Sequence, residues 1–394
     1  MPAADAAAPL QRPVPATWMR GGTSKGVFFL PGDLPAEPAR RDALLLRTIG
    51  SPDPYGRQID GLGGATSSTS KVVLVSRSAQ PGCDVDYLFG QVAVEEPLID
   101  WSGSCGNLAA AVGPFALHAG LVDGAPRDGL ARVRIWQANL GQRIVAHVPM
   151  KGGQVQELGD FRLDGVAFPA AEIRLDFLAP GGGGGLPLLP SGQQRDVLEV
   201  PGIGRVEATL INAGNPTAVV HAAALGLQGT ELPRALNTDA ALLARCEAVR
   251  AQAAVAMGLA PDAASATRDR PATPKLALVA APAAYTASDG RTVAEGDTDL
   301  LVRMLSMGVF HHAVPGTGAI ALAAAAALPE SVIAPLARPN GAGSGLRLGH
   351  PSGLIPVDAR AVQDAGGRWD IAQVSVSRSA RRLMTGQIWV PDER

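Results

Sequence analysis

Residues 102–118 read SGSCGNLAAAVGPFALH, a glycine-rich turn followed by a segment that is apolar on nearly every side. A second stretch of the same kind, PGTGAIALAAAAAL, runs from residue 315 to residue 328. A helix without a polar face has to be buried on every side. We therefore expect two central helices, over residues 107–118 and 319–328, each inside a core of its own.

Most of the remaining chain is predicted to form strands. Apolar segments with alternating or β-branched residues are separated by turn residues, which is typical of a mostly antiparallel β architecture. The expected strands cover residues 71–76, 85–94, 133–136, 144–148, 173–177, 217–221 and 276–279. One further helix is expected over residues 238–257, where Leu242, Cys246 and Val249 share one face, so Cys246 is expected in the core.

Two glycine-rich turns repeat in the same way as the two helices. RGGTSK (residues 20–25) precedes a strand early in the chain, and NAGNP (residues 212–216) precedes a strand later on. This weak duplication predicts an α+β fold with two pseudo-symmetric β-rich halves, each wrapped around one apolar helix, and an active-site cleft between them. The expected halves are residues 10–205 and 206–382, with a C-terminal strand of about residues 383–394 that can return to the first half.

Composition excludes several classes of protein. The chain has 394 residues and a net charge of −2, so it lacks the basic excess of nucleic-acid-binding proteins. Its longest apolar run, residues 319–328, is too short to span a membrane, and its first residues do not form a signal peptide. The three cysteines lie far apart, which disfavours a disulfide framework, a zinc site and an iron–sulfur cluster. We expect a cytoplasmic protein with reduced thiols and no metal.

The paired helix starts predict an anion site. The N-terminus of a helix presents free N–H groups and a partial positive charge, and glycines allow a ligand to approach the backbone. Two such ends facing one cleft suit a ligand with two or more carboxylates. A phosphate ligand is the rival, but the chain has no GxxxxGK[ST] loop, and the strand–helix alternation of a dinucleotide-binding fold is missing.

Several side chains near these turns have more than one possible role. Cys105 directly precedes the first helix, where a thiolate is stabilised, or it is a small buried residue. Lys71 lies where a loop meets a strand, and it can enter the cleft or remain solvated. His311 is suited to catalysis or to ordinary hydrogen bonding. An arginine cluster near the C-terminus is expected at the surface: Arg378, Arg381 and Arg382.

Lysine is rare in this chain. Among 34 basic residues, only Lys25, Lys71, Lys151 and Lys275 are lysine. Arginine cannot replace lysine where a proton must leave, because the guanidinium group is effectively always charged. Each of these four positions is therefore a candidate for proton transfer or for a specific ammonium contact.

Several motifs resemble a known family, the 2-methylaconitate cis-trans isomerases of the PrpF family. The resemblance runs from about residue 15 to residue 391. It is carried by residues 19–29 (MRGGTSKGVFF), 51–55 (SPDPY), 58–71 (QIDGLGGATSSTSK), 84–90 (DVDYLFG), 100–107 (DWSGSCGN), 133–139 (VRIWQAN), 196–205 (DVLEVPGIGR) and 349–353 (GHPSG).

The resemblance implies the diaminopimelate-epimerase-like fold and an isomerase without a cofactor. It implies a role in the methylcitrate cycle of propionate catabolism, where an iron–sulfur 2-methylcitrate dehydratase supplies the tricarboxylate substrate. Lys71 would be the catalytic proton carrier and Cys105 the active-site cysteine. The residues that would line the substrate-binding site are Thr23, Ser24, Lys25, Ser68, Thr69, Ser70, Gly106, Asn107, Lys275, Ser306, Met307 and His311. A homodimer is compatible with the sequence.

One position departs from the wider superfamily and limits the mechanism. Two-base epimerases place a second cysteine at the second helix start, where this chain has Pro315. A single base, Lys71, would therefore take a proton from 2-methyl-trans-aconitate and return it to give the cis isomer. To act as a base, Lys71 would need a lowered pKa, through burial or a neighbouring cation, and Lys25 and Arg20 are the expected candidates for that cation.

Two other interpretations remain open. A 4-oxalomesaconate tautomerase or a methylitaconate isomerase would use the same proton transfer within the same superfamily. A non-catalytic accessory protein of the dehydratase belongs to a different class, and the lack of metal-ligand spacing disfavours it. Conversion of the synthetic trans isomer by the purified protein alone would separate the enzyme from the accessory protein.

Overall fold

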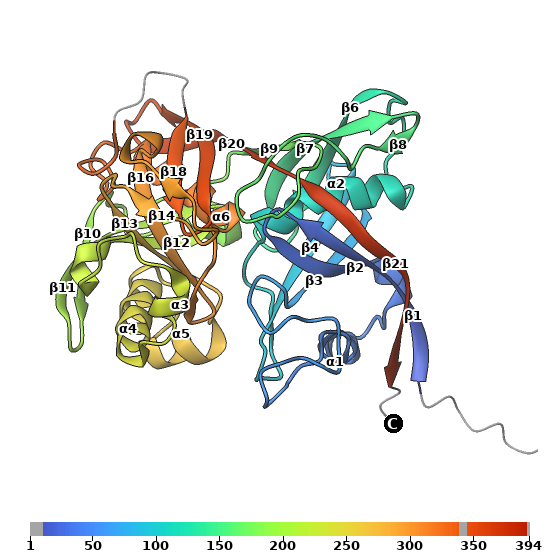
Figure 1. The fold of residues 1–394 in the computed structure, drawn as a ribbon, viewed down its shortest axis with the longest axis horizontal. Coiled ribbons are helices and arrows are strands. Elements are labelled where there is room, and N and C mark those ends of the chain that lie inside the picture. The colour runs from blue at the N-terminus through green and yellow to red at the C-terminus, as the bar shows by residue number, and fades with distance from the viewer. Residues whose placement is uncertain (1–10, 339–344, 392–394) are drawn as a thin grey trace, which may run out of the picture.

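The computed structural model describes residues 11–338 and 345–391. Figure 1 shows two β-rich halves side by side, with α2 (Gly106–His118) inside one and α6 (Gly316–Ala326) inside the other. Both helices are buried along almost their whole length, so the prediction of two central apolar helices is confirmed. α6 begins three residues before the predicted start, because the PGTG turn already belongs to its first turn.

The first half is built from seven main strands. In spatial order their pairings are antiparallel, parallel, antiparallel, parallel, antiparallel and antiparallel. The strands are β1 (Gln11–Gly21), β2 (Ser24–Phe29), β3 (Lys71–Arg77), β4 (Val85–Val92), β6 (Gly129–Gln137), β7 (Gln142–Lys151) and β9 (Ile173–Leu178).

The second half repeats this series of pairings without a change. Its strands are β11 (Gly204–Ala213), β12 (Asn215–His221), β13 (Lys275–Ala280), β16 (Leu300–Ser306), β18 (Leu346–His350), β19 (Gly353–Gln363) and β20 (Trp369–Arg378). Even two short strands before the central helices correspond, since β5 (Ile99–Asp100) pairs with β4 and β17 (Val309–Phe310) pairs with β16. The predicted duplication is thus a strand-by-strand pseudo-symmetry.

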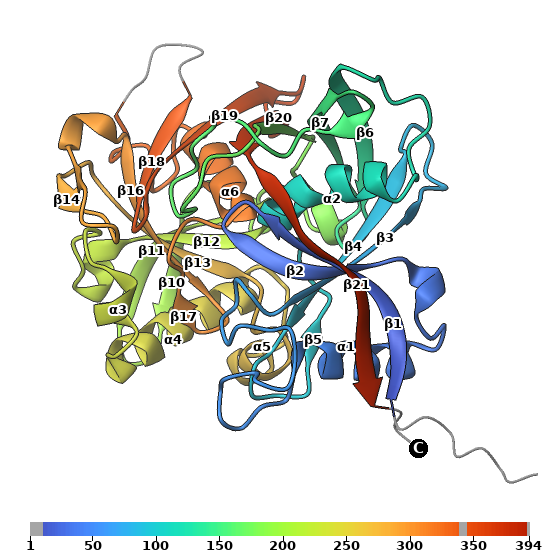
Figure 2. The ribbon, with the colours of Figure 1, turned by 45° about the vertical axis from the view of Figure 1, so that its right-hand side comes forward.

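The strand that follows each half's seven main strands pairs with the other half. After β9 the chain crosses into the second half, where β10 (Asp196–Val200) pairs with β11, and after β20 it returns, so that β21 (Ala380–Pro391) pairs with β1. Figure 2 shows β21 crossing the first half to lie beside β1. The predicted boundary at residue 205 falls inside the β10–β11 hairpin, because Asp196 pairs with Ala208. Residue 10, residues 339–344 and residues 392–394 of the predicted segments lie outside the described residues.

The largest apolar cluster runs through both halves and contains residues of both central helices. α2 contacts β1, β2, β7 and β9, and α6 contacts the corresponding strands β11, β12, β19 and β20. Leu108 and Ile320 are fully buried in this core. Each large side chain of this kind contributes roughly 1.5–3 kcal/mol when buried. The many alanines of both helices keep much of their surfaces narrow, so the strands can approach closely.

The other elements cover the outside of the two halves. α4 (Ala240–Ala256) begins after Asp239, whose carboxylate caps it, and packs against β10 and β13, with Cys246 buried as predicted. The remaining elements are α1 (Pro38–Ile49), α3 (Pro233–Leu236), α5 (Ala263–Asp269), β8 (Gln154–Val155), β14 (Tyr285–Thr286) and β15 (Thr292–Val293). None of the helices in the described ranges has the length and apolar character needed to cross a bilayer.

Candidate active site

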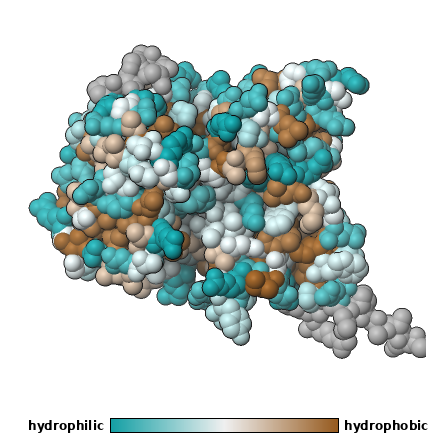
Figure 3. All heavy atoms as spheres, viewed as in Figure 1, coloured by the Kyte–Doolittle hydropathy of each residue, from teal (hydrophilic) through white to brown (hydrophobic). Residues whose placement is uncertain are grey.

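The starts of the two central helices touch each other. A Cβ atom on Gly106 would lie 2.6 Å from the backbone nitrogen of Thr317, and one on Gly316 would lie 2.6 Å from the carbonyl carbon of Gly106. Only glycine fits at either position. The two helix starts meet as predicted, but they are in direct backbone contact and not separated by a cleft. Figure 3 shows the junction of the halves on one face as a recess of pale residues, which are neither strongly apolar nor strongly polar.

Two lysines open equivalent strands beside these helix starts. Lys71 is the first residue of β3 and Lys275 is the first residue of β13. Both are buried, with 6% and 7% of their surface exposed, and both line one cavity together with Cys105. This cavity, which we call the inner cavity, has a volume of about 20 Å³, room for about one water molecule. Substrate can therefore enter only after side chains or the halves have moved.

Neutral acceptors hold both ammonium groups. Lys71 Nζ donates to Gln91 Oε1 at 2.5 Å, and Gln91 in turn donates to the carbonyl oxygens of Ser67 and Ser70. Lys275 Nζ donates to Ser306 Oγ at 3.2 Å and to a backbone carbonyl at 3.4 Å. Hydrogen bonds to neutral acceptors fix the position of an amine without stabilising its charge as a carboxylate would.

Burial makes the cations of the inner cavity easier to deprotonate. It lowers the pKa of Lys71, although Cys105 acts in the opposite direction. The pKa of Lys275 falls to about 8, first because of burial and next because of the positive charge of Lys71. Burial and the neighbouring His312 hold the pKa of His311 well below its usual value, so its imidazole is neutral.

The expected cations, Lys25 and Arg20, point elsewhere. Lys25 Nζ lies 4.4 Å from the centre of the Trp18 ring, and Arg20 donates to the carbonyl and hydroxyl oxygens of Ser379. The cation beside Lys71 is Lys275 instead. The sequence could not reveal this, because the two lysines are more than two hundred positions apart and meet only through the pseudo-symmetry of the halves.

Cys105 is the N-cap of α2. Its Sγ accepts a hydrogen bond from the backbone N–H of Leu108 at 3.4 Å, and its carbonyl accepts one from the hydroxyl of Tyr87 at 3.0 Å. The thiol is 8% exposed and lines the inner cavity. The N-cap of α6 is Pro315, which also lines the cavity but carries no ionisable group. Only one side of the site can therefore supply a sulfur.

Asn107 connects the first helix to a buried arginine. Its amide nitrogen donates to Thr23 Oγ1 at 3.0 Å and to Ser24 Oγ at 3.3 Å, while its oxygen accepts from Arg378 Nε at 3.1 Å. The prediction that Arg378 lies at the surface is wrong, because only 1% of it is exposed. Burial lowers its pKa to about 10, so it stays charged at neutral pH, and its Nη2 finds no acceptor among the described residues.

Asn215 is a site residue that the sequence analysis missed. Its amide donates to the carbonyl of Ser104 at 2.9 Å and to Thr317 Oγ1 at 3.3 Å, and it accepts from the Ser104 N–H at 2.8 Å. It therefore ties the turn before α2 to the start of α6. The available signal was the NAGNP turn itself, which corresponds to the RGGTSK turn that carries Ser24.

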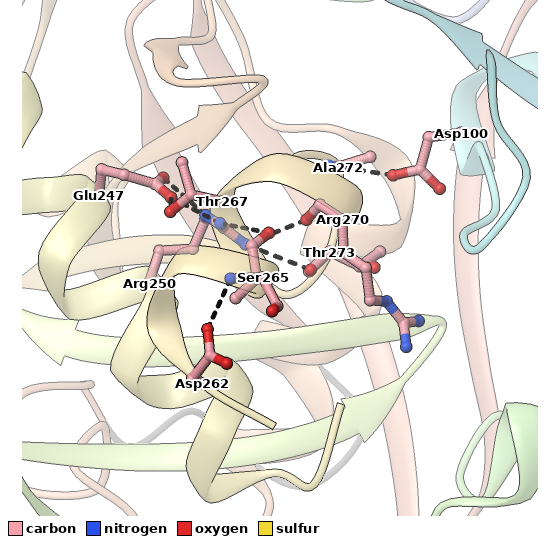
Figure 4. A network of polar contacts seen from close by, with 10 residues as sticks. Asp100, Glu247, Arg250, Asp262, Ser265, Thr267, Arg270, Ala272 and Thr273 are labelled. Carbon is pink, nitrogen blue, oxygen red and sulfur yellow. Dashed lines mark hydrogen bonds and ion pairs between the residues drawn. The ribbon is translucent and has the colours of Figure 1, made fainter. Parts of the chain in front are cut away.

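The loop before Lys275 is held by a dense polar network (Figure 4). Arg250 of α4 donates to the carbonyls of Ala266, Arg270 and Thr273, and it forms an ion pair with Glu247 at 2.6 Å. From the other half, Asp100 accepts a hydrogen bond from the N–H of Ala272 at 3.2 Å. These contacts fix the backbone that leads into β13 and so place the ammonium of Lys275.

The remaining predicted residues divide between the inner cavity and other places. Gly106, Asn107, Ser306 and His311 line the inner cavity, and Ser24 lines both this cavity and a larger one of about 440 Å³. The larger cavity also carries Thr23, Lys25, Ser68, Thr69, Arg20 and Arg381. Ser70 is buried, and its hydroxyl donates a hydrogen bond to Gln58 Oε1. Met307, which has a φ of 54°, lines a separate cavity beside Cys246. The described residues contain no cluster of His, Cys, Asp or Glu suited to a metal.

Comparison with known proteins gives a consistent result. A family model described as "PrpF protein" matches residues 11–391. A protein named 2-methyl-aconitate isomerase from Shewanella oneidensis is 55% identical, with 97% of this chain and 98% of the relative covered. One of the same name from Cupriavidus necator is 53% identical, with 96% and 98% covered.

Solved structures agree on the fold. The crystal structure of a methylitaconate-delta-isomerase superposes with a TM-score of 0.76 at 37% identity, covering 97% of each chain. A hydroxyproline epimerase from Agrobacterium vitis superposes with a TM-score of 0.54 at 13% identity, covering 97% of this chain and 94% of its own, and this likeness concerns the fold alone. The predicted diaminopimelate-epimerase-like fold is confirmed.

Proposed function

This chain belongs to the PrpF protein family, and from that premise we propose that it isomerises 2-methyl-trans-aconitate to 2-methyl-cis-aconitate. The two relatives named for 2-methyl-aconitate share 55% and 53% of their residues with it, whereas the solved methylitaconate isomerase shares 37%. The observation that carries the proposal is Lys71, a buried amine that faces the inner cavity beside Cys105 and the two helix starts.

The reaction needs only one proton transfer in each direction. Neutral Lys71 removes a proton from the substrate methylene group, which is acidified by its own carboxylate and by the adjacent double bond. The electron pair of the broken C–H bond is delocalised into a dienolate, so the former double bond gains single-bond character and rotates. Lys71 then returns the proton to the same carbon, and the cis isomer results with no net change in atoms or electrons.

The surroundings of Lys71 support the added negative charge. The N-termini of α2 and α6 direct free N–H groups and the positive ends of two helix dipoles toward the cavity. Lys275 supplies an ammonium group for a substrate carboxylate, and Arg378 supplies a buried charge behind Asn107. Cys105 would position the substrate or assist the transfer, while His311, being neutral, would offer a hydrogen bond.

Substrate would reach Lys71 through the larger cavity. This cavity adjoins the inner cavity at Ser24 and carries three cationic side chains, Arg20, Lys25 and Arg381. A tricarboxylate would be attracted there first. It would then enter the site as the halves separate, because the inner cavity has room for about one water molecule.

Purified protein and synthetic 2-methyl-trans-aconitate test this proposal. The protein alone should form the cis isomer, and product formed in deuterium oxide should carry deuterium at the methylene carbon. Inactivity of the folded protein alone would favour the accessory role. Rapid turnover without any label, after slow exchange of the lysine proton has been excluded, would refute proton abstraction.

Three finer statements complete the proposal. The substrate would come from an iron–sulfur 2-methylcitrate dehydratase in the cytoplasm, a compartment in keeping with the three unpaired cysteines. A homodimer is proposed as the working form, and sedimentation at several protein concentrations tests it. A 4-oxalomesaconate tautomerase or a methylitaconate isomerase would be revealed if either of those substrates turned over faster than 2-methylaconitate.

A further inference from the structure

Lys71 and Lys275 are counterparts under the pseudo-symmetry of the molecule. Each opens the strand that pairs in parallel with the strand of a glycine-rich turn, β2 in one half and β12 in the other. Lys71 pairs with Gln91 across the β3–β4 ladder and donates its hydrogen bond to it. Lys275 directly precedes the first pair of the β13–β16 ladder, Leu276 with Leu305, and donates to Ser306 of the same strand β16. The pseudo-symmetry thus brings two amines to one small cavity.

Neither amine forms an ion pair with a carboxylate in the part of the chain that the structure describes. Within residues 11–338 and 345–391, no ion pair between a lysine and an acidic side chain involves Lys71 or Lys275, and the acceptors of both are neutral. Asp100 lines the same cavity and its charge favours the protonated form of Lys275, but its oxygens accept hydrogen bonds from the backbone N–H groups of Ser102 and Ala272. Two ammonium ions in such a dry space repel each other strongly, because little solvent screens them.

We propose that Lys71 and Lys275 form one coupled acid–base unit, in which a proton on either amine keeps the other amine neutral. In the empty site this gives one neutral amine and one ammonium ion. A substrate carboxylate that binds the ammonium ion cancels its field, so the neutral partner becomes a stronger base once substrate is present. The catalytic meaning of this coupling rests on the proposed function, but the coupling itself does not.

Other charged groups around the pair do not remove this dependence. Cys105 faces both amines from the start of α2, and a negative sulfur there would favour their protonated forms. Arg250 acts on Lys275 from α4 but is paired with Glu247, and His311 is neutral. The repulsion is seen at Lys275, whose pKa falls to about 8, first because of burial and next because of the Lys71 charge.

The coupling can be measured without substrate. The chain has only four lysines, so protein labelled with carbon-13 at lysine Cε gives four signals that can be followed against pH. In Lys275→Met the titration midpoint of Lys71 should rise by roughly one unit or more, and in Lys71→Met that of Lys275 should rise similarly. Lys25 and Lys151 serve as internal references. Unchanged midpoints in both variants would refute the coupling.

Activity separates a coupled lysine from a simple carboxylate ligand. The rate should rise with pH as the base loses its proton, so Lys275→Met should shift this limb of the kcat/KM profile to higher pH, with partial recovery of activity there. Lys275→Arg keeps the charge and should leave the limb in place. If Lys275→Met only raised KM at every pH, Lys275 would be a ligand contact and the coupling would be wrong.

A saturated tricarboxylate, tricarballylate, tests the second step. It cannot react, yet it should raise the titration midpoint of Lys71 in the native protein and have no such effect in Lys275→Met. A rise of equal size in both proteins would refute the role of Lys275. Because no turnover is involved, these results stand whether or not 2-methylaconitate is the natural substrate.

Discussion

The two halves share every main strand pairing, yet they differ at the starts of their central helices. Both halves have glycine at the first position of the helix, and both have lysine at the start of the neighbouring strand. At the N-cap, however, the first half has Cys105 and the second has Pro315. The framework is therefore symmetric, while the chemistry available to it is not.

This difference shows which features the architecture demands and which the reaction demands. Glycine is required twice because the two helix starts are in backbone contact. A thiol is present once, which suits a reaction that removes and returns a proton on one face. A racemising enzyme would need a proton donor on each side of the substrate carbon. The following predictions test how far the symmetry of the framework extends to the chemistry.

The largest effect is expected for Lys71→Met. Loss of the general base should lower kcat by about a thousandfold or more, the upper range for such groups. Binding of tricarballylate, measured by calorimetry, should be largely retained, because methionine fills the same space. If Lys71→Met kept substantial activity while Cys105→Ser was inactive, the roles of the two residues would be reversed.

Cys105→Ser is expected to have a smaller effect. The proposed mechanism gives the thiol an assisting role, so kcat/KM should fall by about ten- to a hundredfold and remain measurable, the scale of losing one charge-assisted contact. Cys83→Ser is the matched control, since Cys83 lies far from the site and should leave the rate unchanged. A rate below detection in Cys105→Ser would make the thiol essential.

Substitution of the first glycine of either central helix should lower the stability of the protein by a similar amount. Gly106→Ala and Gly316→Ala both place a Cβ atom 2.6 Å from backbone of the other helix, so each should cost about 1–3 kcal/mol of unfolding free energy in urea. Gly32→Ala and Gly296→Ala are controls, one in each half, because nothing lies within 4 Å of their Cβ positions. A marked difference between the first two variants would mean that only one helix start is rigid.

Much of this arrangement could be predicted from the sequence. The two apolar helices and their glycine-rich turns are local patterns, and so are the strands around Lys71 and Cys105. Their burial follows directly from composition and periodicity. The family resemblance then supplied the proposed roles of Lys71 and Cys105, which the residues alone left open.

The rest depended on contacts between distant segments. The crossing of β10 into the second half leaves no local signal, so the predicted boundary at residue 205 falls inside a hairpin, whereas the sequence already allowed for a C-terminal strand that returns to the first half. Arg378 looked like a surface residue because its neighbours Arg381 and Arg382 are charged, but only the latter two are exposed. The place of Asn215 in the site and the proximity of Lys275 to Lys71 likewise follow from the pseudo-symmetry, which the sequence preserves only weakly.

The smallest predicted effect concerns the stability cost of the second lysine. A fall in the pKa of Lys275 from 10.5 to about 8 means that folding disfavours its charged form by about 3 kcal/mol at neutral pH. Lys275→Met removes this cost but also two hydrogen bonds of about 1 kcal/mol each, so a net gain of about 1 kcal/mol is expected at pH 7.

The higher stability expected for Lys275→Met should depend on pH, and this dependence tests its cause directly. Between the folded pKa near 8 and the unfolded value near 10.5, Lys275 of the unmutated protein binds more protons in the unfolded state than in the folded state. The free energy of unfolding of this protein therefore rises with pH over that range. Lys275→Met lacks that rise, and its advantage in urea unfolding should shrink from pH 7 toward pH 10 and then reverse. Lys151→Met, at an exposed position, should show no such trend. A constant difference between native protein and Lys275→Met across this range would mean that Lys275 titrates normally in the folded state, and its likeness to Lys71 would then be one of position alone.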